Sequence, residues 1–202
     1  MKRIDLSGEW KLIRVKNKES VPAQVPGDTH SALLDAGKIP DPYWADNELS
    51  LQWIGREDWI YRRSFNVSSE MLAGKSVFLN CEFFDTISEI RINGSKIGVT
   101  ENMFVRYRFE ARKVLRTGEN TIEVLFRSAE NAAVEASKKL KYPIPFGNNP
   151  VQSPNRNLIR KVQCHSGWDW GPCLMVAGIY GDIYLEACSD ARIEHVCCDQ
   201  KH

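Results

Sequence analysis

Short strand-like segments, separated by turn signals every eight to twelve residues or so, constrain the fold of this chain most. Trp59–Val67 and Asn120–Arg127 are rich in aromatic and β-branched residues, and apolar residues alternate along Ser76–Phe84. Within Ile87–Val99, Asn93-Gly94 is a strong hairpin signal, because a type I′ turn needs positive φ at both positions. The pattern predicts an all-β sandwich.

Other elements complete this expected architecture. Asp28 or Thr29 can cap a short helix from Thr29 to Ala36, with Gly37 just past its end. Pro22 and Pro26-Gly27 are expected to break the chain before that helix. A second helix is expected over residues 130–140, and further strands over residues 6–15, 103–109, 179–188 and 193–196.

Composition excludes several classes of protein. The chain has 202 residues, of which 43% are hydrophobic and 26% are charged, and its net charge is +1. A nucleic-acid surface would need a basic excess, so none is predicted. No apolar run approaches the roughly 18 residues that a membrane span requires. The first ten residues, MKRIDLSGEW, contain no apolar signal-peptide core, so we expect a cytoplasmic location and no membrane partner.

Six cysteines are irregularly spaced, and without a secretion signal we expect them to be free thiols. Cys197-Cys198, with His195 and His202 nearby, could suggest zinc. The paired C-x2-C elements of structural zinc sites are absent, however. We therefore predict no metal and no cofactor.

The stretch from Gln163 to Gly171, QCHSGWDWG, carries the most chemistry. In a loop, Trp168, Asp169 and Trp170 could converge on one cleft. Aromatic rings can cover the C–H face of a sugar, and a carboxylate can accept hydrogen bonds from two neighbouring hydroxyls. The alternative is a buried corner in which both indoles pack and Asp169 caps a backbone.

Two long irregular segments, Ile39–Trp59 and Lys141–Gly171, are expected to lie at one rim of the sandwich. The first contains two prolines and several aromatic residues. Such ordered loops are usually functional or pack over the edge of a core, and both interpretations stay open here.

Three blocks of sequence resemble the N-terminal sugar-binding domain of β-mannosidases in glycoside hydrolase family 2. The first, Arg160–Glu186, contains WDWGP, and the second, Val25–Val67, contains IPDPYWADNE. The third consists of INGSKIG and ENMFVRYRF. The blocks occur in the expected order and cover nearly the whole chain, and the first two strings are unusual.

The resemblance implies a jelly-roll-like, galactose-binding-domain-like sandwich over residues 1–190. Residues 191–202 would begin a truncated immunoglobulin-like domain. Family members are retaining glycosidases whose two catalytic carboxylates, about 5 Å apart, lie in a (β/α)8 barrel. Such a barrel takes about 250 residues, so this chain is expected to lack the catalytic residues and to be inactive alone.

The resemblance also implies site residues. Asp169 would bind hydroxyls of the non-reducing mannose, Trp168 and Trp170 would wall the site, and Trp53 is a further substrate-binding candidate. The pair Asn47-Glu48 resembles the family's catalytic acid motif but lies in a loop rich in proline and aspartate, so it is not predicted to be the acid.

The residues that lead into WDWG have simpler interpretations. Arg160 and Lys161 could orient Asp169, although exposed basic residues on a strand are favoured, and His165 is expected to pack in the loop. Ser166 stands where the family has an aromatic residue, which should soften one wall of the site.

The leading hypothesis is therefore the N-terminal domain of an exo-acting β-mannosidase, with a mannoside as substrate and the barrel as partner. The alternatives are a stand-alone, lectin-like carbohydrate-binding module and a structural interaction domain with an exposed apolar rim.

Overall fold

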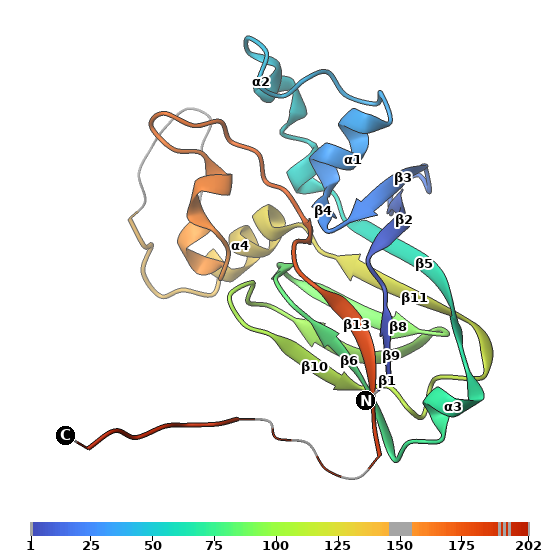
Figure 1. Cartoon of the computed structure of the whole chain (residues 1–202). Helices are drawn as coiled ribbons and strands as arrows, with labels where there is room; N and C mark the ends of the chain where they lie inside the picture. The colour runs from blue at the N-terminus through green and yellow to red at the C-terminus, as the bar shows by residue number, and fades with distance from the viewer. Residues whose placement is uncertain (1, 146–154, 190, 192, 194, 202) are drawn as a thin grey trace.

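The computed structural model describes residues 2–145, 155–189, 191, 193 and 195–201, and its main body is a β-sandwich (Figure 1). One layer is a four-stranded sheet ordered β1-β13-β6-β10, and the other is a six-stranded sheet ordered β3-β2-β5-β11-β8-β9. Neighbouring strands pair antiparallel throughout both layers. The predicted all-β sandwich is confirmed.

The first sheet consists of β1 (Lys2–Asp5), β13 (Ile183–Cys188), β6 (Ser76–Cys81) and β10 (Tyr107–Glu110). The second consists of β3 (Ser20–Val25), β2 (Gly8–Arg14), β5 (Trp59–Val67), β11 (Gly118–Phe126), β8 (Ser88–Ile92) and β9 (Ser95–Thr100). A small third sheet joins β4 (Gly27–Asp28), β12 (Gly178–Ile179) and β7 (Phe84–Asp85).

Helices are few and short. The α-helices are α1 (Thr29–Asp35), α2 (Asn47–Leu51), α3 (Ser69–Leu72) and α4 (Ala129–Ser137). Three single 3-10 turns are η1 (Ile54–Arg56), η2 (Arg156–Leu158) and η3 (Gln163–Ser166). Among the described residues, no helix is both long and apolar enough to cross a bilayer.

The core lies between the two large sheets. Buried residues alternate with partly buried ones along β11 and β13, as expected for strands with one face toward a core. Phe126, fully buried on β11, packs edge-on against Tyr61 at 5.7 Å between ring centroids and lies 5.9 Å from Phe84. Burial of these apolar side chains supplies most of the stability of the sandwich.

Local signals in the sequence explain several elements. Asn93 and Gly94 both have positive φ, at 50° and 81°, in the turn between β8 and β9. The Asp28 carboxylate accepts hydrogen bonds from the backbone N–H groups of His30 and Ser31 at the start of α1, and Gly37 follows its end with φ of 64°. The expected hairpin and capped helix are confirmed.

Two expectations are wrong. Residues 20–25 form strand β3 despite Pro22, because β3 is the edge of its sheet and one side of it has no partner strand that would require the missing N–H. The strand expected at residues 193–196 is absent from the described residues Ile193, His195 and Val196. A strand needs a neighbour to pair its backbone groups, and no pairing involves them.

The division between residues 1–190 and a second domain from residue 191 stays a prediction. Arg192, Glu194 and His202, which fall within that second segment, lie outside the described residues.

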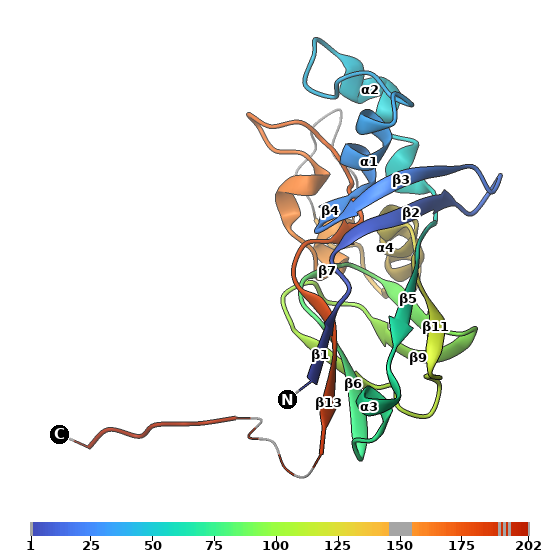
Figure 2. The same cartoon turned by 45° about the vertical axis from the view of Figure 1, so that its right-hand side comes forward.

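The two long segments lie at one end of the sandwich. Figures 1 and 2 show α2 and the orange segment with η3 at the end opposite α3 and the N-terminus. The small sheet β4-β12-β7 lies beneath them. Residues 146–154 of the second segment lie outside the described residues.

Candidate functional site

A hollow of about 400 Å³ opens at this rim, and we call it the rim hollow. The first long segment contributes four residues, the second contributes four, and Pro172 follows directly after the second. They are Pro42, Tyr43, Ala45, Glu48, Trp168, Asp169, Trp170, Gly171 and Pro172. The structure therefore brings together Trp168, Asp169 and Trp170, which the sequence singled out, with residues about 120 positions earlier in the chain.

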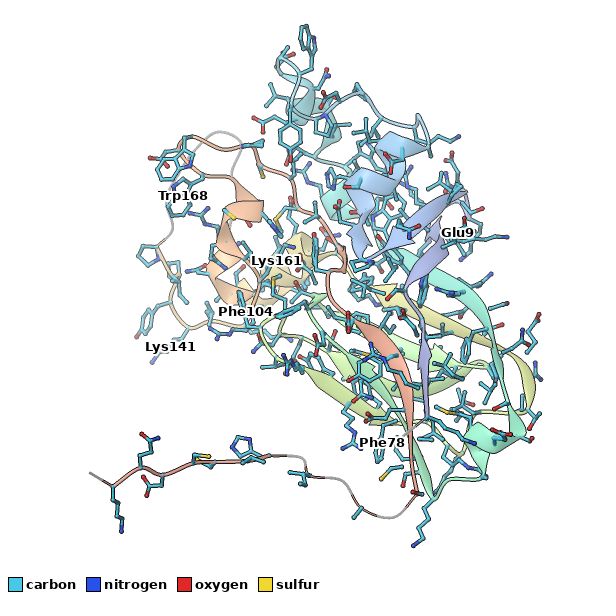
Figure 3. All side chains as sticks on the ribbon, viewed as in Figure 1. Glu9, Phe78, Phe104, Lys141, Lys161 and Trp168 are labelled. Atoms are coloured by element: carbon cyan, nitrogen blue, oxygen red, sulfur yellow. The ribbon has the colours of Figure 1, made fainter. Side chains whose placement is uncertain are left out.

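The Trp168–Trp170 turn faces outward. Trp168 is 39% exposed and Trp170 is 82% exposed, and their ring centroids lie 5.7 Å apart with the planes at 70°. Asp169 is also exposed, and among the described residues no hydrogen bond to its carboxylate is found. The alternative of a buried corner is wrong, because neither the two indoles nor the carboxylate is packed away from solvent. Trp168 is labelled at the tip of its loop in Figure 3.

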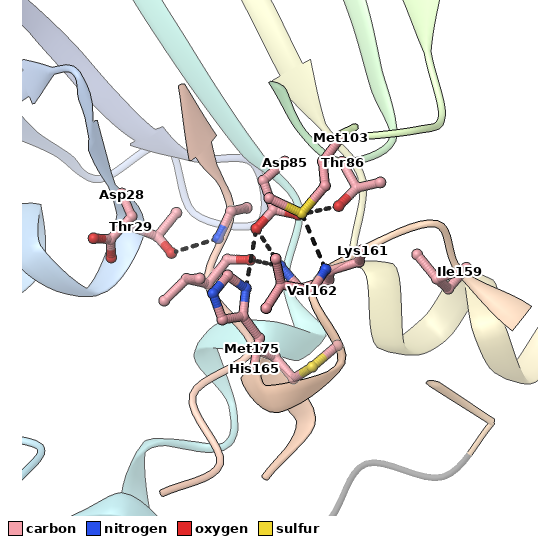
Figure 4. A network of polar contacts seen from close by, with 12 residues as sticks. Asp28, Thr29, Asp85, Thr86, Met103, Ile159, Lys161, Val162, His165 and Met175 are labelled. Carbon is pink, nitrogen blue, oxygen red and sulfur yellow. Dashed lines mark hydrogen bonds and ion pairs between the residues drawn. The ribbon is translucent and has the colours of Figure 1, made fainter. Parts of the chain in front are cut away.

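The chain just before the Trp168–Trp170 turn is fixed by a buried ion pair. The Lys161 side chain is 3% exposed, and its ammonium group contacts the fully buried carboxylate of Asp85 on β7 (Figure 4). The ammonium also donates to the carbonyl of Val176 at 2.7 Å. His165 Nδ1 lies 3.2 Å from the same Asp85 carboxylate, and the Thr86 hydroxyl donates to it as well. The interpretation of Lys161 as an exposed basic residue is wrong, whereas Arg160 is exposed.

Burial and neighbouring charges shift the pKa values of the groups beneath the turn. Burial alone would raise the pKa of Asp85, but His165 and Lys161 outweigh it and hold that pKa below its ordinary value. Burial lowers the pKa of Lys161, and Asp85 opposes part of that shift. Burial also lowers the pKa of His30, on α1, from 6.5 to about 4. His30 is therefore neutral at neutral pH.

The chain just after the Trp168–Trp170 turn is buried too. Cys173 is fully buried; its N–H donates to Glu48 Oε2 at 2.8 Å, and its carbonyl accepts from Gln52 Nε2 at 2.7 Å. An exposed tip is thus held between two buried ends. The tip can present two aromatic faces and a carboxylate to a ligand without rearranging its supports.

Two other residues that the sequence singled out, Trp53 and Ser166, lie outside the lining of the rim hollow. Trp53 does not line the rim hollow: its ring lies 6.0 Å from that of Trp59 and 4.4 Å from the Arg14 guanidinium. Its role in substrate binding stays a prediction. Ser166 is buried and its hydroxyl contacts Met175 Sδ at 3.0 Å, so the missing aromatic residue does not soften a wall of the hollow.

Sequence reasoning missed Asp85 and Arg156. Asp85 is a single carboxylate in the apolar run Phe83–Ile87, and an isolated charge in such a run was the available signal. The Arg156 guanidinium donates to the carbonyl of Gly167 at 2.6 Å and lies 5.7 Å from the Trp168 ring. Nothing in the surrounding loop sequence marks Arg156.

Comparison with known proteins places this arrangement in a family. Residues 10–181 match the family model described as glycosyl hydrolase 2 galactose-binding domain-like. The chain belongs to this family. The resemblance to β-mannosidases is confirmed by curated relatives: the β-mannosidase of Rattus norvegicus is 35% identical over 195 residues, and that of Capra hircus is 37% identical over 188 residues. These matches cover 95% and 91% of this chain but only 22% and 21% of the relatives.

Solved structures agree with this assignment. The β-D-mannosidase of Dictyoglomus thermophilum aligns with a TM-score of 0.91 and 41% identity, covering 96% of this chain and 23% of that one. An exo-chitosanase of Amycolatopsis orientalis aligns with a TM-score of 0.66 at 15% identity, covering 94% of this chain and 21% of that one, and shows a shared fold alone. This chain therefore corresponds to roughly a fifth of the length of these relatives.

Proposed function

We propose that this chain is the N-terminal carbohydrate-binding domain of an exo-acting, retaining β-mannosidase, and that it forms one wall of the pocket for the non-reducing terminal mannose. The exposed Trp168–Trp170 turn over the rim hollow is the observation that carries the proposal. The similarity to β-mannosidases supports the choice of sugar. The cytoplasmic location stays a prediction from the sequence.

The chemistry of the wall follows from the exposed groups. Asp169 offers two carboxylate oxygens, which can accept charge-assisted hydrogen bonds from two adjacent sugar hydroxyls. Trp168 and Trp170 stand nearly perpendicular, so one ring can lie against the C–H face of a pyranose while the other closes an edge. Gly167, with φ of 89°, gives the sharp change of direction from which the turn projects.

Hydrolysis is assigned to a second part of the proposed enzyme. A retaining glycosidase needs two carboxyl groups about 5 Å apart, one as nucleophile and one as acid/base. In this proposal both belong to a (β/α)8 barrel that packs against the rim. In this proposal Glu48 has a supporting role instead, since its Oε2 accepts a hydrogen bond from the backbone N–H of Cys173.

The test compares the 202-residue chain with the complete product of its gene, here called the full-length enzyme. We expect the full-length enzyme to hydrolyse a chromogenic β-mannoside and to prefer it to the matching β-glucoside, while the 202-residue chain is inactive. Activity of the 202-residue chain alone would contradict the assignment of catalysis to another domain. A full-length enzyme inactive on β-mannosides would contradict the proposed substrate.

The lectin-like alternative makes a different prediction. A self-sufficient module would bind free mannose at millimolar concentration or below, measured by calorimetry on the 202-residue chain. We expect no such binding, because the rim hollow offers one wall of a pocket and is open on its other side.

A further inference from the structure

The role of the unusual string IPDPYWADNE is not explained by sugar contacts alone. Its last two residues begin α2, a helix of five residues, and Gln52, the residue that caps the end of α2 with helical backbone angles, lies four positions after Glu48. Residues at this spacing project from the same face of a helix. Both side chains bind one residue that lies just after the other long segment, Cys173.

The two side chains bind both backbone polar groups of Cys173. Glu48 Oε2 accepts the N–H at 2.8 Å, and Gln52 Nε2 donates to the carbonyl at 2.7 Å while also donating to the carbonyl of Glu48 at 2.8 Å. Cys173 lies in no strand and is fully buried. Each of these hydrogen bonds satisfies a backbone group of a buried residue, and the loss of such a bond is costly.

Cys173 is tightly coupled to the sugar-facing turn. It follows Asp169 by four residues, and the intervening Pro172 has a fixed φ. The N–H of Trp168 donates to the carbonyl of Gly171 at 3.3 Å, which closes the turn on itself. A shift of Cys173 would therefore move the whole Trp168–Trp170 turn relative to the rim hollow.

The segment after Cys173 is also prevented from sliding. Gly55 packs so closely on Met175 that a Cβ atom at Gly55 would lie 2.4 Å from the Cβ of Met175. The Gly55 carbonyl accepts from the hydroxyl of Ser128, which ties this contact to α4. The first long segment therefore holds the residues just after the second at two points, Cys173 and Met175.

From these contacts we propose that Glu48 and Gln52 are positioning residues, which place the Trp168–Trp170 turn by clamping the backbone of Cys173. The clamp acts within the sugar site proposed above, so its effect on catalysis rests on that function. Its effect on Cys173 does not, and the two are measured separately.

The first experiment measures hydrogen exchange of the Cys173 amide by NMR in the 202-residue chain. Glu48→Ala should speed exchange by about tenfold or more, because the N–H loses its acceptor. Glu48→Gln keeps an acceptor oxygen and should preserve protection. Leu49→Ala, on the same helix and 54% exposed in the native chain, is the matched control and should change nothing. Unchanged protection in Glu48→Ala would overturn the clamp.

Gln52→Met provides a second variant of similar size if Glu48→Ala does not fold. It removes the donor to the Cys173 carbonyl and leaves the N–H bonded to Glu48. We expect the amide signals of residues 168–171 and of Cys173 to shift while the Cys173 amide stays protected. Signals in the native position would overturn the role of Gln52.

The second experiment measures β-mannoside hydrolysis by the full-length enzyme. Glu48→Ala should lower kcat/KM by about 10- to 100-fold through a misplaced turn, and Glu48→Gln should restore it to within about threefold. A loss in Glu48→Gln with a protected Cys173 amide would indicate direct contact with sugar and would overturn the positioning role. Unchanged kcat/KM in Glu48→Ala with an unprotected amide would overturn it too. A native full-length enzyme inactive on β-mannosides would refute the proposed function, while the exchange data would still decide the clamp.

Discussion

The interior of the sandwich and its rim are held together by different interactions. Between the sheets, apolar side chains such as Phe126 and Leu79 are fully buried, and the backbone is paired in antiparallel ladders. At the rim, buried polar groups such as Asp85 and Lys161 hold segments whose backbone is not paired with a neighbouring strand. The aromatic side chains at the tip of the rim are exposed instead, and Trp170 is 82% exposed.

The difference shows how the molecule separates stability from recognition. A long irregular segment cannot satisfy its backbone by strand pairing, so side chains must bind it one group at a time. Those side chains are buried below the turn. The groups at the tip are consequently free to meet a ligand, and substitutions there should barely change stability.

The largest effect is expected in the interior. Phe126→Ala should lower the free energy of unfolding by about 4 kcal/mol, because it leaves a cavity against Tyr61 and Phe84. Urea unfolding of the 202-residue chain, followed by circular dichroism, measures this. A loss below about 1 kcal/mol would mean that the sandwich does not depend on this cluster.

The next effect concerns the buried ion pair of the rim. Lys161→Met should destabilise the chain by about 3 kcal/mol, because it leaves the Asp85 carboxylate buried without its ammonium partner. The double variant Lys161→Met, Asp85→Asn removes that charge and should recover much of the loss. If the double variant is less stable than the single one by a further 1 kcal/mol or so, the pair is not the source of the effect.

The pH dependence of stability tests the buried histidine. The folded state lowers the pKa of His30 from 6.5 to about 4, so the unfolded chain binds more protons between these values. Stability should be complete above pH 6.5 and fall by on the order of 2–3 kcal/mol as the pH drops toward 4. His30→Gln should flatten this slope in urea unfolding series at pH 7, 5.5 and 4.5. The same slope in that variant would assign it to other groups.

The smallest effect on stability is expected at the tip. Trp170→Ala should change the free energy of unfolding by less than about 0.5 kcal/mol, because the ring is 82% exposed. In the full-length enzyme it should still raise KM for a β-mannoside. A large loss of stability would show that the ring packs against protein after all, and would remove the contrast between interior and rim.

Much of the fold was predictable because its signals are local. Alternation along β11, the Asn93-Gly94 turn and the Asp28 cap each depend on a few neighbouring residues. Strand β3 was not predictable in this way, since Pro22 is tolerated only because of where β3 lies in the sheet. The position of an edge strand is a property of the whole sheet.

The candidate site also has one part that local sequence predicted and another part that it did not. The string Trp168-Asp169-Trp170 marked the turn by its chemistry, and the two long segments were expected at one rim. The supports beneath were missed, because Lys161 with Asp85, and Glu48 with Cys173, are each separated by more than seventy residues in sequence. Such pairs become visible only once the topology brings their elements together.

The most direct test of the account is Asp169→Asn, measured as kcat/KM for a chromogenic β-mannoside in the full-length enzyme and as unfolding free energy in the 202-residue chain. We expect kcat/KM to fall about 100-fold or more, equivalent to about 2.7 kcal/mol of lost transition-state stabilisation, with unfolding unchanged. An unchanged kcat/KM would contradict the claim that the exposed turn at the rim binds the sugar.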